Sequence, residues 1–131
     1  FVEGSDDICS DRIMHIASLI SSRVEYADSE RRRTIHLAGV FVNNFVNHLY
    51  AVGADTLERE GLDFDMLKPL IMETALKAVA SGDPRSVQTG PAVRGDKAVT
   101  ERHIAMLEDD KLRQEIYKQI TESIWETSKK I

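Results

Sequence analysis

Imidazole and amide side chains recur along one apolar segment, at a spacing that suggests ligand binding or proton transfer. On a helix of about 100° per residue, His36, Asn43 and Asn47 fall within about 40° of one another, and Asn44 and then His48 border this stripe. In a cleft, asparagines could orient a substrate while a histidine transfers protons. A structural polar seam is the alternative and the more common outcome, because buried asparagines often fix the register of helices or of a two-fold partner.

A second candidate is the predicted loop over residues 88–96, which holds two glycines, a proline, a hydroxyl and an opposed charge pair. Arg94 could bind a carboxylate or phosphate group bidentately, with the Thr89 hydroxyl or backbone N–H groups beside it. In the structural alternative, Asp96 caps the next helix and Arg94 pairs with a carboxylate or with helix carbonyls. Both interpretations stay open at this point.

The sequence predicts neither a metal site nor a disulfide. His36 and His48 lie on one predicted helix, but neither has a histidine or glutamate partner at the spacing of four that a helical zinc site uses. Cys9 is the single cysteine. The glycine-rich dinucleotide motif, the phosphate-binding loop motif and the motifs of serine hydrolases and zinc proteases are all missing from the sequence. We therefore do not expect these residues to bind a nucleotide on their own.

The elements that must position these side chains are predicted to be mostly α-helical. Apolar residues recur at helical spacing over about residues 8–22, 30–60, 64–81, a short stretch after 96 and a last stretch over 110–127. Residues 1–3 and 24–27 are typical of short strands on either side of the first helix. A strand, a helix and a strand in this order form a unit that docks on a parallel sheet.

Composition limits the classes of function. The 131 residues carry a formal net charge of −5, so no basic surface is predicted that would attract nucleic acid. Apolar residues make up 42% and charged residues 30%, which is typical of a globular domain. No apolar run approaches the roughly 20 residues of a membrane-spanning helix. We expect a cytoplasmic protein without nucleic acid or membrane partners.

Two longer motifs give the sequence a family resemblance. Residues 33–50 and 88–96, together with Gly61-Leu62 and Pro69-Leu70, resemble a bacterial family of predicted oxidoreductases. In that family a Rossmann-like NAD(P)-binding domain precedes a helical C-terminal domain of unknown function. The chain is more distantly similar to the 6-phosphogluconate dehydrogenase and β-hydroxyacid dehydrogenase group, whose helical C-terminal domains dimerise and close the substrate cleft.

The resemblance implies a domain organisation. Residues 1–28 would be the tail of the Rossmann-like cofactor domain, with a strand–helix–strand order, and residues 29–131 would form an all-helical, bundle-like substrate and dimerisation domain. The protein would be a homodimer that acts on a small-molecule substrate. NAD(P) would be bound in the full-length protein, mainly by residues outside this chain.

For a domain of this kind, the residue types themselves lead us to expect roles for the candidate residues. His36, Asn43 and Asn47 would be catalytic, whereas the substrate would be bound by Asn44, Thr89, Arg94 and Asp96. The catalytic lysine of the β-hydroxyacid dehydrogenases has no counterpart, because His36 stands near its place and Val40 stands where their asparagine follows. The alternative is a non-catalytic module of a Rossmann-type protein that serves dimerisation or partner binding.

Overall fold

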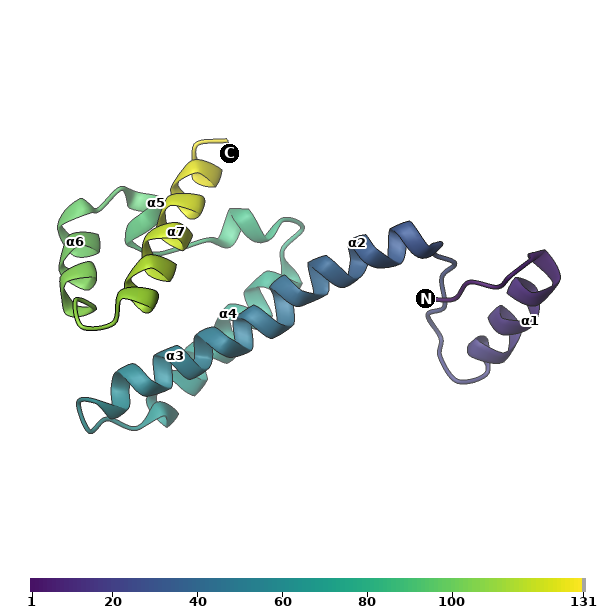
Figure 1. Ribbon diagram of the computed structural model, residues 1–131, viewed down its shortest axis with the longest axis horizontal. Helices are drawn as coiled ribbons and strands as arrows, with labels where there is room; N and C mark the ends of the chain where they lie inside the picture. Colours follow the sequence, from purple (N-terminus) through teal and green to yellow (C-terminus); the bar gives the residue numbers. More distant parts are fainter. Residues whose placement is uncertain (131) are drawn as a thin grey trace. The chain divides into compact units, whose positions relative to one another are not determined.

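The computed structural model describes residues 1–130 and is mostly helical, as predicted (Figure 1). Its contacts divide it into two compact units, the first over Phe1–Gly53 and the second beginning at Ala54. The helices are α1 (Asp7–Ser18), α2 (Ser29–Gly39), the π-helix η1 (Val40–Phe45), α3 (Val46–Glu58), the 3₁₀-helix η2 (Phe64–Leu67), α4 (Lys68–Ala80), the 3₁₀-helix η3 (Pro84–Val87), α5 (Pro91–Arg94), α6 (Lys97–Met106) and α7 (Lys111–Ser128).

Aspartate caps explain where several helices begin. In each case a carboxylate accepts a hydrogen bond from a backbone N–H three residues further on, which satisfies one of the unpaired donors of the first helical turn. The caps of α1, α2, α6 and α7 are Asp6, Asp28, Asp96 and Asp110. The helix starts after Asp96 and Asp110 were therefore visible in the sequence.

The predicted strand–helix–strand unit is not supported, and its strands are wrong. Val2 and Tyr26 form an isolated parallel bridge, in which the Val2 N–H donates to Glu25 O at 3.0 Å and the Ala27 N–H donates to Val2 O at 3.1 Å. Helix α1 does connect the two segments. A parallel ladder gains stability from neighbouring strands on both sides, and the described residues provide none, so the pairing stops at this bridge. The proposed domain boundary at residue 28 stays a prediction.

The first segment is nevertheless held closely against α1 and α2. A Cβ atom on Gly4 would lie 2.3 Å from the backbone N of Ser10, so only glycine fits there. The Glu3 carboxylate accepts hydrogen bonds from the Ser29 backbone N–H and hydroxyl, both at 3.0 Å, and pairs with Arg32. Glu3 thus stabilises the start of α2, where a negative charge also complements the helix dipole.

The long predicted helix over residues 30–60 contains a break in its regular hydrogen bonding. It runs as α2, η1 and α3, and η1 is a π-helix over Val40–Phe45. A π turn closes from residue i to i+5 and holds one more residue than an α turn. The assignment of residues to helix faces at 100° per residue, which assumes a regular α-helix, therefore does not hold across η1.

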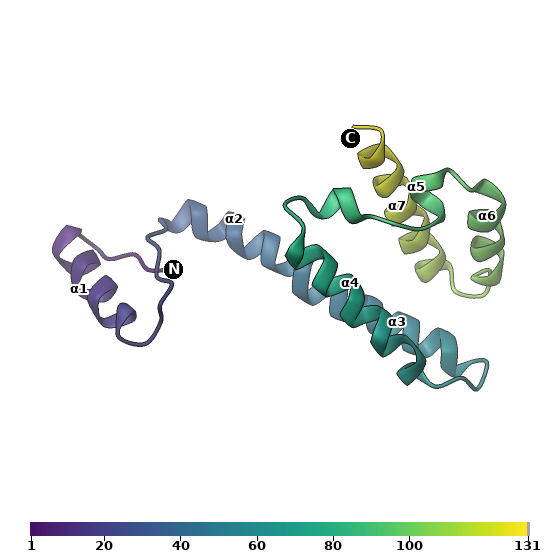
Figure 2. The same cartoon turned by 180° about the vertical axis from the view of Figure 1, so that it is seen from behind.

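In the second unit, α5, α6 and α7 pack together in a small bundle (Figure 2). Ala92 on α5 is buried, with 8% of its surface exposed. The Gln114 amide donates to Ile104 O at 2.8 Å and so joins α7 to α6. The sequence did not predict α5 or η3, because both are single turns within a segment rich in proline and glycine. No helix among residues 1–130 combines the length and apolarity needed to cross a membrane.

Candidate functional site

The predicted imidazole and amide residues lie on one continuous stretch of helix in the first unit. His36 is on α2, Asn43 and Asn44 are on η1, and Asn47 is on α3. All four are exposed. Within the described part of the chain, none of these side chains makes a hydrogen bond. An exposed amide or imidazole without a protein partner can bind a ligand without first losing an internal bond.

The π-helix changes which of these residues share a face. In a regular α-helix, residues seven and eleven positions after His36 lie on its face, which selects Asn43 and Asn47. Because the π turn holds one extra residue, Asn44 and His48 take those places. Asn43 and Asn47 remain aligned with each other beside them. We call His36, Asn43, Asn44, Asn47 and His48 the polar strip.

The spacing argument placed His48 only at the border of the stripe, whereas the π turn brings it onto the face of His36. The exposed side chain of His48 lies on α3, directly after the π-helix. Apolar sequence around Asn43 and Asn44 gives no signal that distinguishes a π turn from an α turn. π-bulges are frequently found at functional sites, so η1 independently supports a functional role for this helix.

Large apolar side chains flank the polar strip. Phe41 and Phe45, one helical turn apart, form an edge-to-face pair with ring centroids 5.2 Å apart. Phe41 is 58% exposed and Val42 is 75% exposed. Contiguous exposed apolar surface of this kind usually marks a binding or association surface. We call Leu37, Phe41, Val42 and Phe45 the apolar face of this helix.

Of the candidate residues in the second unit, two have exposed side chains that are unpaired among residues 1–130, and one caps a helix. Thr89 and Arg94 are exposed, and within residues 1–130 the Arg94 guanidinium has no ion pair. Asp96 caps α6 by accepting from the Val99 N–H at 3.1 Å. This is the capping role given above as the structural alternative for Asp96. Arg94 lies in the last turn of α5, and Gly95 follows it with a φ of 63°.

An ion-pair network in the second unit accounts for other charged residues. Arg113 pairs with Asp55 and Asp110, and Arg59 pairs with Asp110 at 3.4 Å. The backbone N–H of Arg113, together with the charges of Arg113 and Arg59, lowers the pKa of Asp110. These groups connect the end of α3 to the start of α7, which is a structural role.

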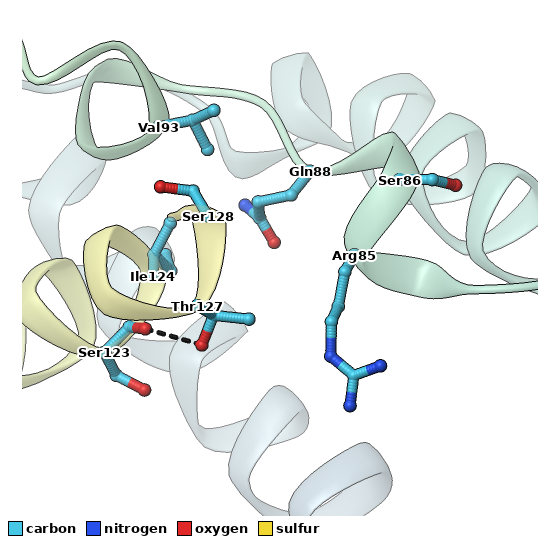
Figure 3. Close-up of a pocket in the computed structure, with 8 residues that line it drawn as sticks. All are labelled: Arg85, Ser86, Gln88, Val93, Ser123, Ile124, Thr127 and Ser128. Carbon is cyan, nitrogen blue, oxygen red and sulfur yellow. Dashed lines mark hydrogen bonds between the residues drawn. The ribbon is translucent and has the colours of Figure 1, made fainter. Parts of the chain in front are cut away.

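A groove of about 400 Å³ in the second unit was not predicted from the sequence (Figure 3). It lies between η3, the segment leading to α5, and the last turns of α7. Its lining residues are Arg85, Ser86, Gln88, Val93, Ser123, Ile124, Thr127 and Ser128. They come from segments about 35 positions apart in the sequence, so no local motif marks them. Among residues 1–130, no group of histidine, cysteine, aspartate or glutamate side chains is arranged to hold a metal ion.

Comparisons with known proteins bear on this arrangement. A family model described as "Domain of unknown function (DUF2520)" matches residues 1–124. A solved structure, "putative NADP oxidoreductase BF3122 from Bacteroides fragilis", is similar with a TM-score of 0.87 and 44% sequence identity. The similarity covers 93% of this chain and 47% of that chain, so this chain spans about half the length of that protein. The curated proteins contain no match.

Proposed function

We propose, from the premise that this chain belongs to the DUF2520 family, that it is the helical domain of an NADP-dependent oxidoreductase. In this proposal it supplies part of the substrate cleft and the interface of a homodimer. The observation that carries the proposal is the 44% identity, over 93% of the chain, to a protein named as an NADP oxidoreductase. The family resemblance of the two sequence motifs points in the same direction.

In the proposal the cofactor is bound mainly by residues outside this chain. A Rossmann-type site needs a glycine-rich turn between a strand and a helix N-terminus, where backbone N–H groups meet the pyrophosphate. Residues 1–130 include no such turn. The remaining half of the enzyme would bind the dinucleotide, and the bound nicotinamide would supply hydride chemistry.

The residues of this chain would bind and orient the substrate and move a proton. His36 would donate or accept a proton through a ring nitrogen, which suits an exposed imidazole without an internal partner. Asn43, Asn44 and Asn47 would orient the substrate through their amide groups, and their exposure leaves them available for this. Of the residues in the second unit, Arg94 and Thr89 are free to contact an anionic group.

Asp96 is assigned a smaller part. Its carboxylate already accepts the Val99 N–H, and a carboxylate has further lone pairs for one more donor. In the proposal the Asp96 carboxylate contacts the substrate and caps α6 at the same time.

The non-catalytic alternative has one observation in its favour. The apolar face is highly exposed, with Val42 at 75% and Leu37 at 59%, and covering such a surface is the usual role of a subunit or domain interface. Dimerisation and a catalytic strip are compatible on one helix. The alternative differs from the proposal in one respect: the polar strip contacts only protein groups and no substrate.

A titration with NADPH tests the proposal. The full-length protein is expected to bind NADPH saturably, measured by the change in nicotinamide fluorescence, whereas residues 1–131 alone are expected not to bind. Absence of NADPH binding by the full-length protein would contradict the proposal.

A variant separates catalysis from binding. A screen of small carbonyl compounds with NADPH first finds one that the full-length protein reduces. With that compound, His36→Gln is expected to lower kcat about 100-fold and to leave the Kd of NADPH unchanged. His15→Gln, at an exposed position of α1, is the matched control and should keep both values. An unchanged kcat in His36→Gln would remove His36 from the catalytic machinery.

A further inference from the structure

The groove beside α7 has one cationic side chain and otherwise neutral walls. Among its lining residues Arg85 alone carries a formal charge. Its Nη1 lies 3.3 Å from both carboxylate oxygens of Asp83. A guanidinium has five N–H donors, so the pairing holds the group in place and leaves donors available to a second acceptor. Asp83 is not a lining residue, so the groove presents free guanidinium N–H donors and no carboxylate, which favours an anion over a cation.

Two hydroxyl groups on the opposite side, those of Thr127 and Ser128, use their protons within α7. The Thr127 hydroxyl donates to Ser123 O and the Ser128 hydroxyl donates to Trp125 O, both at 2.8 Å. Each hydroxyl has a single proton. Because that proton is already used, the hydroxyl oxygen can only accept a hydrogen bond from a ligand. Figure 3 shows the Thr127 oxygen at the end of α7 and the Arg85 guanidinium on the other side of the groove.

The remaining lining groups are apolar or adaptable. Val93 and Ile124 provide apolar surface, and the Gln88 side chain extends toward the end of α7 (Figure 3). The Gln88 amide uses one proton on Thr89 O at 3.1 Å, which leaves a second donor and an acceptor. A groove of about 400 Å³ is within the range of small-molecule sites.

We propose that this groove binds a small monocarboxylate with a short apolar chain. The carboxylate would accept from the free N–H groups of Arg85 and the apolar chain would pack on Val93 and Ile124. A phosphate or a dicarboxylate fits less well, because a second negative charge would meet the acceptor oxygens of Thr127 and Ser128 without a second cation. The groove shares no residue with the polar strip, and ligand binding in it does not require the proposed oxidoreductase activity.

Methyl NMR of the full-length protein tests this site with sodium butyrate as the probe. The Val93 and Ile124 methyl signals are expected to shift saturably, while those of Val79, which is 86% exposed on α4, should not. Arg85→Gln is expected to weaken butyrate binding about tenfold, as loss of a charge-assisted hydrogen bond would. Arg102→Gln, at an exposed position of α6 outside the groove, should bind butyrate as the wild type does.

The neutral and doubly charged analogues complete the test. Butyramide, of the same size but uncharged, and inorganic phosphate are both expected to bind more weakly than butyrate. The proposal is overturned by unsaturable shifts, by equal binding of butyramide, by tighter binding of phosphate, or by an Arg85→Gln protein that binds butyrate unchanged. Thermal melting of Arg85→Gln verifies folding, and because the Asp83 carboxylate keeps its bond from the residue 85 backbone N–H, a melting temperature near that of the wild type is expected.

Discussion

The polar strip of the first unit and the α5–α7 bundle of the second use polar side chains in opposite ways. In the bundle, His103 bonds the Tyr117 hydroxyl at 2.8 Å and Asp96 caps α6. On the polar strip, His36 and Asn44 are exposed and have no such partner among residues 1–130. The same residue types thus build structure in one region and stay available in the other.

This difference shows why residue type alone does not identify a site. Histidines are found in both regions, yet the ring of His103 is half-buried and lies edge-to-face with Tyr117. Polar groups that are satisfied internally lose a bond when a ligand competes for them, whereas unpaired exposed groups do not. The comparison predicts that substitutions on the helix of the first unit change association and activity, whereas substitutions in the bundle change stability.

The largest expected effect is on association through the apolar face. Phe41→Asp places a charge where Phe41 and Phe45 form their exposed pair, and the Kd of the proposed homodimer is expected to rise at least about 30-fold, as for a central interface residue. Sedimentation equilibrium of the full-length protein measures it. Val79→Asp, at another exposed apolar position, is the control and should dimerise normally. A wild type that is monomeric at high micromolar concentration contradicts the interface.

A smaller effect is expected on the stability of the bundle. Gly95 has a φ of 63°, and a Cβ atom there would lie 3.2 Å from the Trp125 ring. Gly95→Ala is expected to lower the free energy of unfolding by about 1–2 kcal/mol, because an L residue pays this cost in the left-handed region. Gly82→Ala meets no atom within 4 Å and should be nearly neutral. Urea unfolding compares the two, and equal stabilities would contradict the role of Gly95.

The smallest effect concerns acid. The pKa of Asp110 is lowered, first by the Arg113 backbone N–H. A carboxyl whose pKa is lower in the folded state stabilises the fold above its unfolded pKa, of about 4, and this contribution is lost as the pH falls through the folded value. Asp110→Asn should therefore melt lower than the wild type at pH 7 and lose less stability on acidification to pH 3. Asp109→Asn, at the exposed neighbouring position, should follow the wild type. If the melting temperatures of all three proteins fall equally between pH 7 and pH 3, Asp110 does not contribute to the pH dependence of stability.

Local signals explain which parts of the fold the sequence predicted. Aspartate caps such as Asp110 and stop signals such as Gly61, with its φ of 68°, act over a few residues and can be read directly. The predicted strands failed because pairing at Val2 depends on neighbours that local sequence does not describe. The π-helix was missed because its hydrogen-bond pattern does not depend on a distinctive residue type.

The candidate site divides in the same way. The sequence singled out His36 and the asparagines, since their types and their apolar surroundings are local properties. Their alignment, with His48 in place of Asn47 beside His36, follows from the π turn and needed the structure. The groove lined by Arg85 and Thr127 needs two distant segments to meet, so spacing arguments could not find it.

Histidine modification tests most directly whether the polar strip faces a ligand. In the full-length protein, diethyl pyrocarbonate should modify His36 and His48 rapidly and His103 slowly, as peptide mass spectrometry can measure. Saturating NADPH is expected to slow modification of His36 severalfold and to leave the slow rate of His103 unchanged. If NADPH binds by fluorescence while His36 reacts at the same rate with and without it, the polar strip does not line the cofactor-bound cleft and the central claim is wrong.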